Sequence, residues 1–365
     1  MRIQWGRFAI SVTFIVLLAV TMVGCQSTSV RSAKIYMQQD DPENAKEVLL
    51  EGAKYSPEDP ELWYILGKVY AELDEWAEMD AAFNKANELT SKYSDDIKVT
   101  RYENWRMKFN AAVTPFNDGD YEAVIEILQT ALVIKPNDME THKRLGTSYL
   151  QIGQFGLAEE HLLAAIAAEE DAQDLSTRRN LLLLYWQQED YDKVIKIADE
   201  MLAMDAYNGE LDEETNALKS DTIQKKALSL QQLNRTDDAI ATWTDAIASD
   251  PNNADFYFNK ALLLHSAERF AEAAVAYRKS IELNPDDNEA RINAARAMLG
   301  GEQYQSIVDV LEPWLFPGGS VADDVVVSDQ MDPYMLLRAA YLNLGMDNKA
   351  DILARILVRL QEQGR

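Results

Sequence analysis

Apolar and small residues recur along the chain with a period of 34 residues. In the unit that begins at Pro60, positions 4, 7, 8, 11, 24 and 27 carry Trp63, Leu66, Gly67, Tyr70, Phe83 and Ala86. Ala, Leu, Glu and Lys are frequent throughout, which favours helix. The pattern predicts nine helix-turn-helix units, starting at residues 26, 60, 105, 139, 175, 220, 254, 288 and 331.

The repeated positions carry residue types that suit the packing of two helices. Position 8 is Ala or Gly in seven of the nine units, so the two helices of a unit approach closely. Position 11 is Tyr in five units and position 17 is aromatic in six, and these rings fill the remaining space. We therefore interpret the aromatic stripe as core, not as a cofactor site. Doublets such as Asp40-Asp41, Asn252-Asn253 and Asp286-Asp287 lack the spacing of a calcium loop, and they are expected to cap helices.

The residues at these positions resemble the tetratricopeptide repeat family over nearly all of the chain after the N-terminal segment. The match is strongest in the units that start at 60, 139 and 254. The resemblance implies an all-α fold, an α–α superhelix (solenoid) of about nine helix-turn-helix units. Such repeats depend on contacts between neighbouring units.

Three segments depart from the repeat. Residues 94–104 add about three helical turns before the unit at 105, and Pro115 must kink or stop the first helix of that unit. Residues 209–219 are a second, acidic insertion. Residues 315–330 are expected to form a loop because of Pro317-Gly318-Gly319, with a short strand over 325–327 as the alternative.

The resemblance also implies a groove lined by the first helix of each unit, where partners bind. The apolar stripe at these positions is expected to be an interaction surface, with close packing of the stripe on itself as the alternative. An Asn ladder at position 6 would bond a peptide backbone, although Arg144 and Lys225 interrupt it. The expected groove residues are Phe109, Asn110, Lys143, Arg179, Asn180, Trp186, Lys225, Leu228, Phe258, Asn259, Leu262, His265, Asn293 and Arg296.

The basic residues of the expected groove indicate that the partner carries a negative charge there. Lys143 and Arg179 are expected to bind a carboxylate of the partner. Chaperone-binding relatives hold a C-terminal carboxylate with a set of residues that Lys143, Asn180 and Lys225 match. Thr147 and Asp221 do not match it.

The N-terminus reads as a targeting segment. Arg2 and Arg7 precede an apolar run, and the end of that run, Met22-Val23-Gly24-Cys25, resembles a bacterial lipobox. The resemblance implies that residues 1–24 are removed and that Cys25 is acylated. Gln26 follows the cysteine, which by the same resemblance implies the periplasmic face of the outer membrane. The alternative is an uncleaved helix in the inner membrane.

Composition excludes several classes of function. The formal net charge is −26, which argues against a nucleic-acid partner. Cys25 is the single cysteine, and the three histidines are far apart in sequence, so no metal ligand set is visible. His161 is expected at the surface. No arrangement of residues indicates catalysis, a cofactor or a small-molecule substrate.

The sequence thus predicts a membrane-anchored scaffold or adaptor that binds a protein or peptide in envelope assembly, secretion or cell-wall machinery. A structural spacer without a dedicated groove is the alternative, and an enzyme is the least favoured class. The predicted domains are a signal peptide (1–24), a lipidated N-terminus with a short tether (25–31), repeat units one to eight (26–314), an insertion loop (315–330) and a capping unit (331–364).

Overall fold

The computed structural model describes residues 27–169, 174–207, 209, 211–322, 328 and 330–363. The described residues are helices joined by turns, with no strand among them. The chain divides into two compact units, residues 1–180 and 181–365. The predicted signal peptide and Cys25 lie outside the described residues, as does the alternative strand over 325–327.

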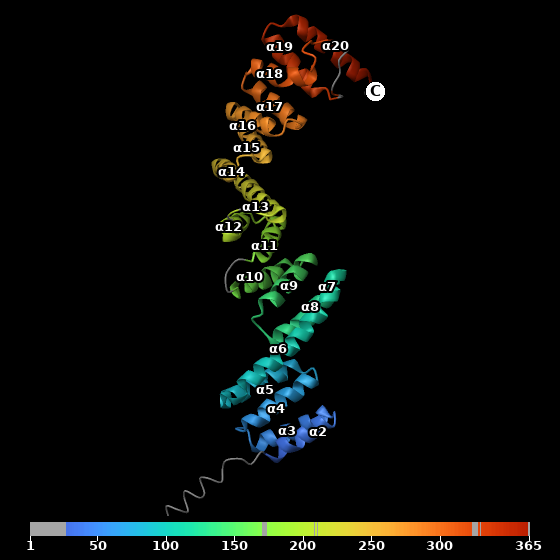
Figure 1. The fold of residues 1–365 in the computed structure, drawn as a ribbon, viewed down its shortest axis with the longest axis vertical. Helices are drawn as coiled ribbons and strands as arrows, with labels where there is room; N and C mark the ends of the chain where they lie inside the picture. The colour runs from blue at the N-terminus through green and yellow to red at the C-terminus, as the bar shows by residue number, and fades with distance from the viewer. Residues whose placement is uncertain are drawn as a thin grey trace, which may run out of the picture. The chain divides into compact units, whose positions relative to one another are not determined.

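In the N-terminal unit the helices pack mainly against helices that are close to them in chain order (Figure 1). They are α2 (Thr28–Gln38), α3 (Pro42–Tyr55), α4 (Pro60–Glu72), α5 (Trp76–Leu89), the 3₁₀ turn η1 (Ser91–Tyr93), α6 (Ser94–Ala111), α7 (Val113–Asp118), α8 (Tyr121–Ile134), α9 (Met139–Gln151), α10 (Phe155–Ala167) and the start of α11 (Leu175–Gln187). Because α2 begins at Thr28, the segment expected as a tether is helical from that residue onward.

Within the C-terminal unit, too, the helices pack mainly against helices close to them in chain order. This unit holds the rest of α11, α12 (Tyr191–Leu202), the 3₁₀ turn η2 (Asp205–Tyr207), α13 (Glu213–Gln232), α14 (Thr236–Ser249), α15 (Ala254–Ser266), α16 (Phe270–Leu283), α17 (Asn288–Gly300), α18 (Tyr304–Leu315), α19 (Asp332–Asn343) and α20 (Asp347–Gln363). The described helices therefore form the nine predicted pairs, and a repeat solenoid is confirmed.

Position 15 of every repeat lies in the turn between the two helices and has a left-handed backbone, with φ between 55° and 78°. The next amide donates to the carbonyl at position 11 over 2.8–3.0 Å in all nine units. This is a Schellman turn, which satisfies the last carbonyls of the first helix. Three units use Gly here, and six use Asp, Glu or Asn, as at Asp74 and Glu268. The shared turn fixes the repeat register.

The small residues at position 8 pack as the sequence predicts. A Cβ atom on Gly67 would lie 2.5 Å from the Phe83 ring, and one on Gly146 would lie 2.6 Å from Leu162 Cγ. Ala261 and Ala295 are fully buried at the same position. Close helix contact therefore requires a small side chain there, because interiors are packed to near-crystalline density.

The insertions also follow the predictions where they are described. Residues 94–104 lengthen α6, which ends at Ala111, and α7 carries Pro115 after the break. Residues 213–219 lengthen α13 at its start. Asp41, Asn253 and Asp287 accept backbone hydrogen bonds as N-caps, as expected for their doublets.

Candidate functional site

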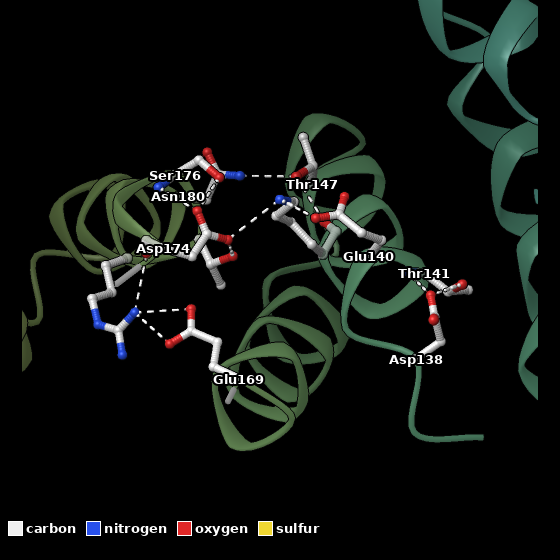
Figure 2. Close-up of polar contacts among 11 residues, drawn as sticks. Asp138, Glu140, Thr141, Thr147, Glu169, Asp174, Ser176 and Asn180 are labelled. Carbon is white, nitrogen blue, oxygen red and sulfur yellow. Dashed lines mark hydrogen bonds and ion pairs between the residues drawn. The ribbon is translucent and has the colours of Figure 1, made fainter. Parts of the chain in front are cut away.

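The first helices of the N-terminal unit carry a polar cluster between α9 and α11 (Figure 2). Lys143 on α9 donates to Glu140 over 2.6 Å and lies 3.3 Å from the Asp174 carboxylate, which precedes α11. Asn180 on α11 donates to the Thr147 hydroxyl over 2.8 Å. The cluster thus brings together Lys143 and Asn180, two of the predicted groove residues, and it already contains carboxylates for the lysine.

Asp174 is an internal anion in this cluster. It accepts hydrogen bonds from the Ser176 amide and hydroxyl over 2.9 and 2.6 Å and from the Thr177 hydroxyl over 2.6 Å. Burial raises the pKa of Asp174, but these hydrogen bonds and the charge of Lys143 outweigh it and hold the pKa at about 2. For Lys143, burial lowers the pKa, yet Glu140 and Asp174 raise it above its ordinary value. Both groups are therefore charged at neutral pH.

A buried ion pair supports the same region. Arg178 donates to both Glu169 oxygens over 3.0 and 2.8 Å, and its guanidinium also reaches the Asp174 carbonyl. The two side chains are 7% and 2% exposed. Each charge depends on the other because desolvation of an unpaired ion is costly. The pair joins the end of α10 to the start of α11.

Rings and cations meet where α6 and α7 contact α9. Phe109 stacks on Trp105 with ring centroids 5.2 Å apart. The Arg144 guanidinium lies 4.3 Å from the Phe109 centroid and 5.7 Å from that of Phe116. Asn110, beside Phe109, is exposed. Sequence reasoning placed Phe109 here, but treated Arg144 only as a gap in the Asn ladder.

The C-terminal unit presents a different surface on its first helices. We call four exposed apolar residues on these helices the leucine row: Leu228, Leu262, Met335 and Leu342, with exposures of 36%, 38%, 53% and 46%. Leu228 on α13 and Leu262 on α15 both occupy position 9, so the repeat places them on corresponding faces. Phe258 is half-buried and packs edge-on against Tyr277.

A cleft opens between α13 and α15 beside this row. Its volume is about 470 Å³. Phe258 and Asn259, both predicted groove residues, line it together with Ser220, Asp221, Gln224 and Asp255. The cleft therefore combines a ring with several hydrogen-bonding groups.

Most charged groove residues of this unit are paired within the chain. Lys225 forms an ion pair with Asp221, and its ammonium lies 5.8 Å from the Trp186 ring centroid. Arg296 forms an ion pair with Asp332 and donates to Asn293 over 2.9 Å.

Two further groove residues are less accessible than the sequence predicts. Asn293 is only 8% exposed, and its role in a peptide-binding ladder stays a prediction. His265 is half-buried, with its ring edge-on to Phe270 and Tyr277. Burial lowers the pKa of His265, and the charge of Arg296 lowers it further.

Two histidines that are distant in sequence meet in space. The Nδ1 atoms of His142 on α9 and His161 on α10 are 3.0 Å apart, and His161 stacks on Tyr149. The expectation of a surface His161 is wrong, because positions 4 and 23 of the unit face each other across the helix pair. Burial lowers the pKa of His161, and His142 lowers it further. Among the described residues, no group of three or more His, Cys, Asp or Glu side chains is placed to hold a metal ion.

A family model of the tetratricopeptide repeat matches residues 30–94, 143–209 and 225–304, together more than half of the chain. The chain belongs to the tetratricopeptide repeat family. It is thus a repeat scaffold of the kind that mediates protein interactions, and the fold is typical of non-catalytic proteins.

Two curated relatives are similar to this tetratricopeptide repeat chain. The human protein O-mannosyl-transferase TMTC1 is 24% identical over 181 residues, which are 50% of this chain and 20% of the relative. The DnaJ homolog subfamily C member 7 homolog of Dictyostelium discoideum is 20% identical over 290 residues, 74% of this chain and 51% of the relative. The chain therefore spans about a fifth and about half of these proteins.

One solved tetratricopeptide repeat structure is similar to this chain at low identity. It is the C-terminal part of a tetratricopeptide repeat protein from Cytophaga hutchinsonii, with 14% identity and a TM-score of 0.47. The match covers 69% of this chain and 95% of that one.

Within this family assignment, the predicted groove residues divide into two groups. Leu228, Leu262 and Arg179 are exposed on first helices. Lys143 and Lys225 are already bound to carboxylates of the same chain. The partner-binding role of both groups stays a prediction.

No helix of the described part of the chain combines the length and apolar character needed to cross a bilayer.

Proposed function

We propose that this tetratricopeptide repeat protein is an adaptor that binds a protein or peptide partner on the first helices of its C-terminal unit. The observation that carries the proposal is the leucine row. Leu228 and Leu262 stay exposed at the same position of two successive repeats, and exposed apolar side chains on first helices are typical of an interaction surface. Each side chain is 36–53% exposed, so covering it would contribute about 0.5–1.5 kcal/mol of apolar burial.

The cleft between α13 and α15 complements this row. Its side-chain amides and carboxylates would fix the register of an extended segment, while the leucines supply affinity. Asn259 carries a donor and an acceptor, which suits a peptide bond of the partner. No catalytic role enters the proposal.

The test is capture of the partner by the full chain with Leu228 and Leu262 both changed to Glu. Photocrosslinkers on α13 and α15 should label a specific protein in membranes, and the double variant should lose that product. The matched control is Val275→Glu on the second helix α16, where Val275 is 67% exposed beside an apolar depression of about 590 Å³. Loss of the product with Val275→Glu alone would place the partner on the second helices instead. A chain that captures nothing specific would favour a structural spacer.

We also propose that acylated Cys25 tethers the protein to the periplasmic face of a bacterial outer membrane, where it serves envelope assembly, secretion or cell-wall machinery. The support is the lipobox-like end of the N-terminal segment. Acyl chains would supply the membrane affinity. Labelling with a palmitate analogue should mark the natural protein and not Cys25→Ser. Label retained by Cys25→Ser would contradict the proposal, and a natural protein that carries no label and fractionates with the inner membrane would support an uncleaved helix.

A further inference from the structure

Position 23, in the second helix of each repeat, departs from its pattern in one unit. In the unit that starts at 139 it is His161 on α10, and His142 faces it from position 4 on α9. We call these two residues the histidine pair. The other eight units have an apolar residue or Thr at position 23: Val48, Ala82, Ile127, Ile197, Thr242, Ala276, Val310 and Leu353. A titratable ring therefore replaces a side chain that cannot change its charge.

The contacts of the histidine pair fix where its protons lie. His142 Nε2 is 2.9 Å from the carbonyl oxygen of Pro136, which can only accept, so this nitrogen carries a proton. Trp63 donates from the same repeat position to the Pro57 carbonyl over 2.7 Å. In neutral His142 the Nδ1 atom is then an acceptor, and His161 Nδ1–H, 3.0 Å away, donates to it. One N–H···N hydrogen bond thus joins the two helices.

Side chains of α8, α9 and α10 surround the histidine pair. The Tyr149 ring of α9 stacks on His161, and the Tyr149 hydroxyl accepts from the Gln129 amide of α8. Glu160 is the anion beside His161 on α10. The nearby cations already pair with carboxylates, Lys135 with Asp138 and Lys143 with Glu140 and Asp174. The charge of the pair therefore depends mainly on its own two rings and on Glu160.

The histidine pair accepts one additional proton more easily than two. The first can add to His161 Nε2, which leaves the hydrogen bond between the two Nδ1 atoms intact. The second must add to His142 Nδ1, because His142 Nε2 is already protonated. Two N–H groups on two cations would then face each other across 3.0 Å, and the hydrogen bond would be replaced by repulsion.

We propose that the histidine pair is a pH-sensitive switch that holds α9 and α10 together near neutral pH and loosens them when both rings are protonated. The inference goes beyond the proposed function, because the pair lies in the N-terminal unit and the leucine row in the C-terminal unit.

The direction of the pH dependence follows from proton binding. Burial lowers the pKa of His161 and the charge of His142 lowers it further, which outweighs the opposite effect of Glu160. The histidines of the unfolded chain have an ordinary pKa of about 6.5. Below that pH the unfolded chain binds more protons than the folded pair does. The contribution of the pair to stability is therefore complete above about pH 7 and falls as the pH drops toward 5.

The experiment measures hydrogen–deuterium exchange of the full chain at pH 7.5 and 5.0, with rates corrected for the intrinsic effect of pH. Protection of α10 amides should fall at least about tenfold at the lower pH, the factor for a pKa one unit below its ordinary value. Helix α5 is the internal control, because its residue at position 23 is Ala82. Nuclear magnetic resonance of the imidazole nitrogens should show two titration steps, with the second below about pH 5.5.

The matched variant is His142→Trp with His161→Ala, which copies the residues Trp63 and Ala82 of another unit and keeps an N–H donor for Pro136. Its α10 protection should change less than about twofold between the two pH values. Three results would overturn the inference: a tenfold loss that survives in this variant, an equal loss in α5 of the natural chain, or no loss in α10. Two titration steps that both lie near the ordinary histidine pKa would overturn it as well.

Discussion

The first helices of the two units carry contrasting chemistry. In the N-terminal unit, α9 and α11 hold a network in which Lys143, Asp174 and Asn180 bind other side chains of the chain. In the C-terminal unit, the first helices also carry ion pairs such as Lys225–Asp221, but Leu228 and Leu262 beside them are exposed. Positions 5 and 6 of the first helices therefore stabilise the N-terminal unit, whereas position 9 remains exposed in the C-terminal unit. The turn at position 15 is the same in both units, so it does not account for this contrast.

The largest expected effect comes from the buried ion pair of the N-terminal unit. Glu169→Ala leaves the Arg178 guanidinium buried without its carboxylate, which should cost about 3–5 kcal/mol of the free energy of unfolding. Urea unfolding followed by circular dichroism measures the loss. Glu160→Ala, an exposed change on α10, should have little effect. Equal midpoints for the two variants would show that the network does not stabilise the unit.

A change in helix packing should have the next largest effect, and it tests the C-terminal unit. Ala273 is fully buried on α16 at position 20 of its repeat. Ala273→Leu should overpack the contact and cost about 1–3 kcal/mol. Ala248→Leu on α14 is the control, because Ala248 is exposed. A thermal midpoint that is unchanged in Ala273→Leu would contradict the close helix contact.

The repeat register was predictable because it depends on residue size and spacing within one unit. Gly67 and Gly146 had to be small, and the structure places them against Phe83 and Leu162. The left-handed turn at position 15 had a signal that sequence reasoning missed, since Gly119 already marked it. Local rules of this kind hold in every unit.

The pairing of the charged groove residues with other side chains of the chain was not predictable in the same way. Lys143 was expected to meet a partner, but its carboxylates come from Glu140 and from Asp174, which directly precedes α11. His142 and His161 lie 19 residues apart, and only the register of two facing helices brings them together. Pairing across helices depends on side-chain reach, which residue type and repeat position do not specify.

Acidification should weaken the polar network with a defined sign. The unfolded Asp174 carboxyl has an ordinary pKa of about 3.9, and the folded one about 2. Its stabilising contribution is present above pH 4 and is lost as the pH falls toward 2. Asp174→Asn should therefore cost about 1 kcal/mol at pH 6, allowing for partial exposure, and less at each lower pH. Urea unfolding at pH 6, 4 and 3 measures the difference in the free energy of unfolding between the variant and the natural protein. Asp95→Asn, a change at an exposed residue of α6, should show no such difference. A difference for Asp174→Asn that does not change with pH would show that the Asp174 charge does not stabilise the network.

The smallest expected effect is that of Leu262→Glu on the free energy of unfolding, and it tests whether the leucine row contributes to the stability of the fold. Leu262→Glu should change the free energy of unfolding by no more than about 0.5 kcal/mol, because an exposed side chain on a helix loses few contacts. Its neighbour Leu263 is 6% exposed, and Leu263→Ala should cost about 2–5 kcal/mol by leaving a cavity. Adjacent residues on one helix thus give a matched pair in which only burial differs. If Leu262→Glu destabilises the protein as Leu263→Ala does, the row packs within the chain and the two units use their first helices in the same way. If it does not, Leu262 remains available to a partner, and losing that partner is the only consequence the variant should have.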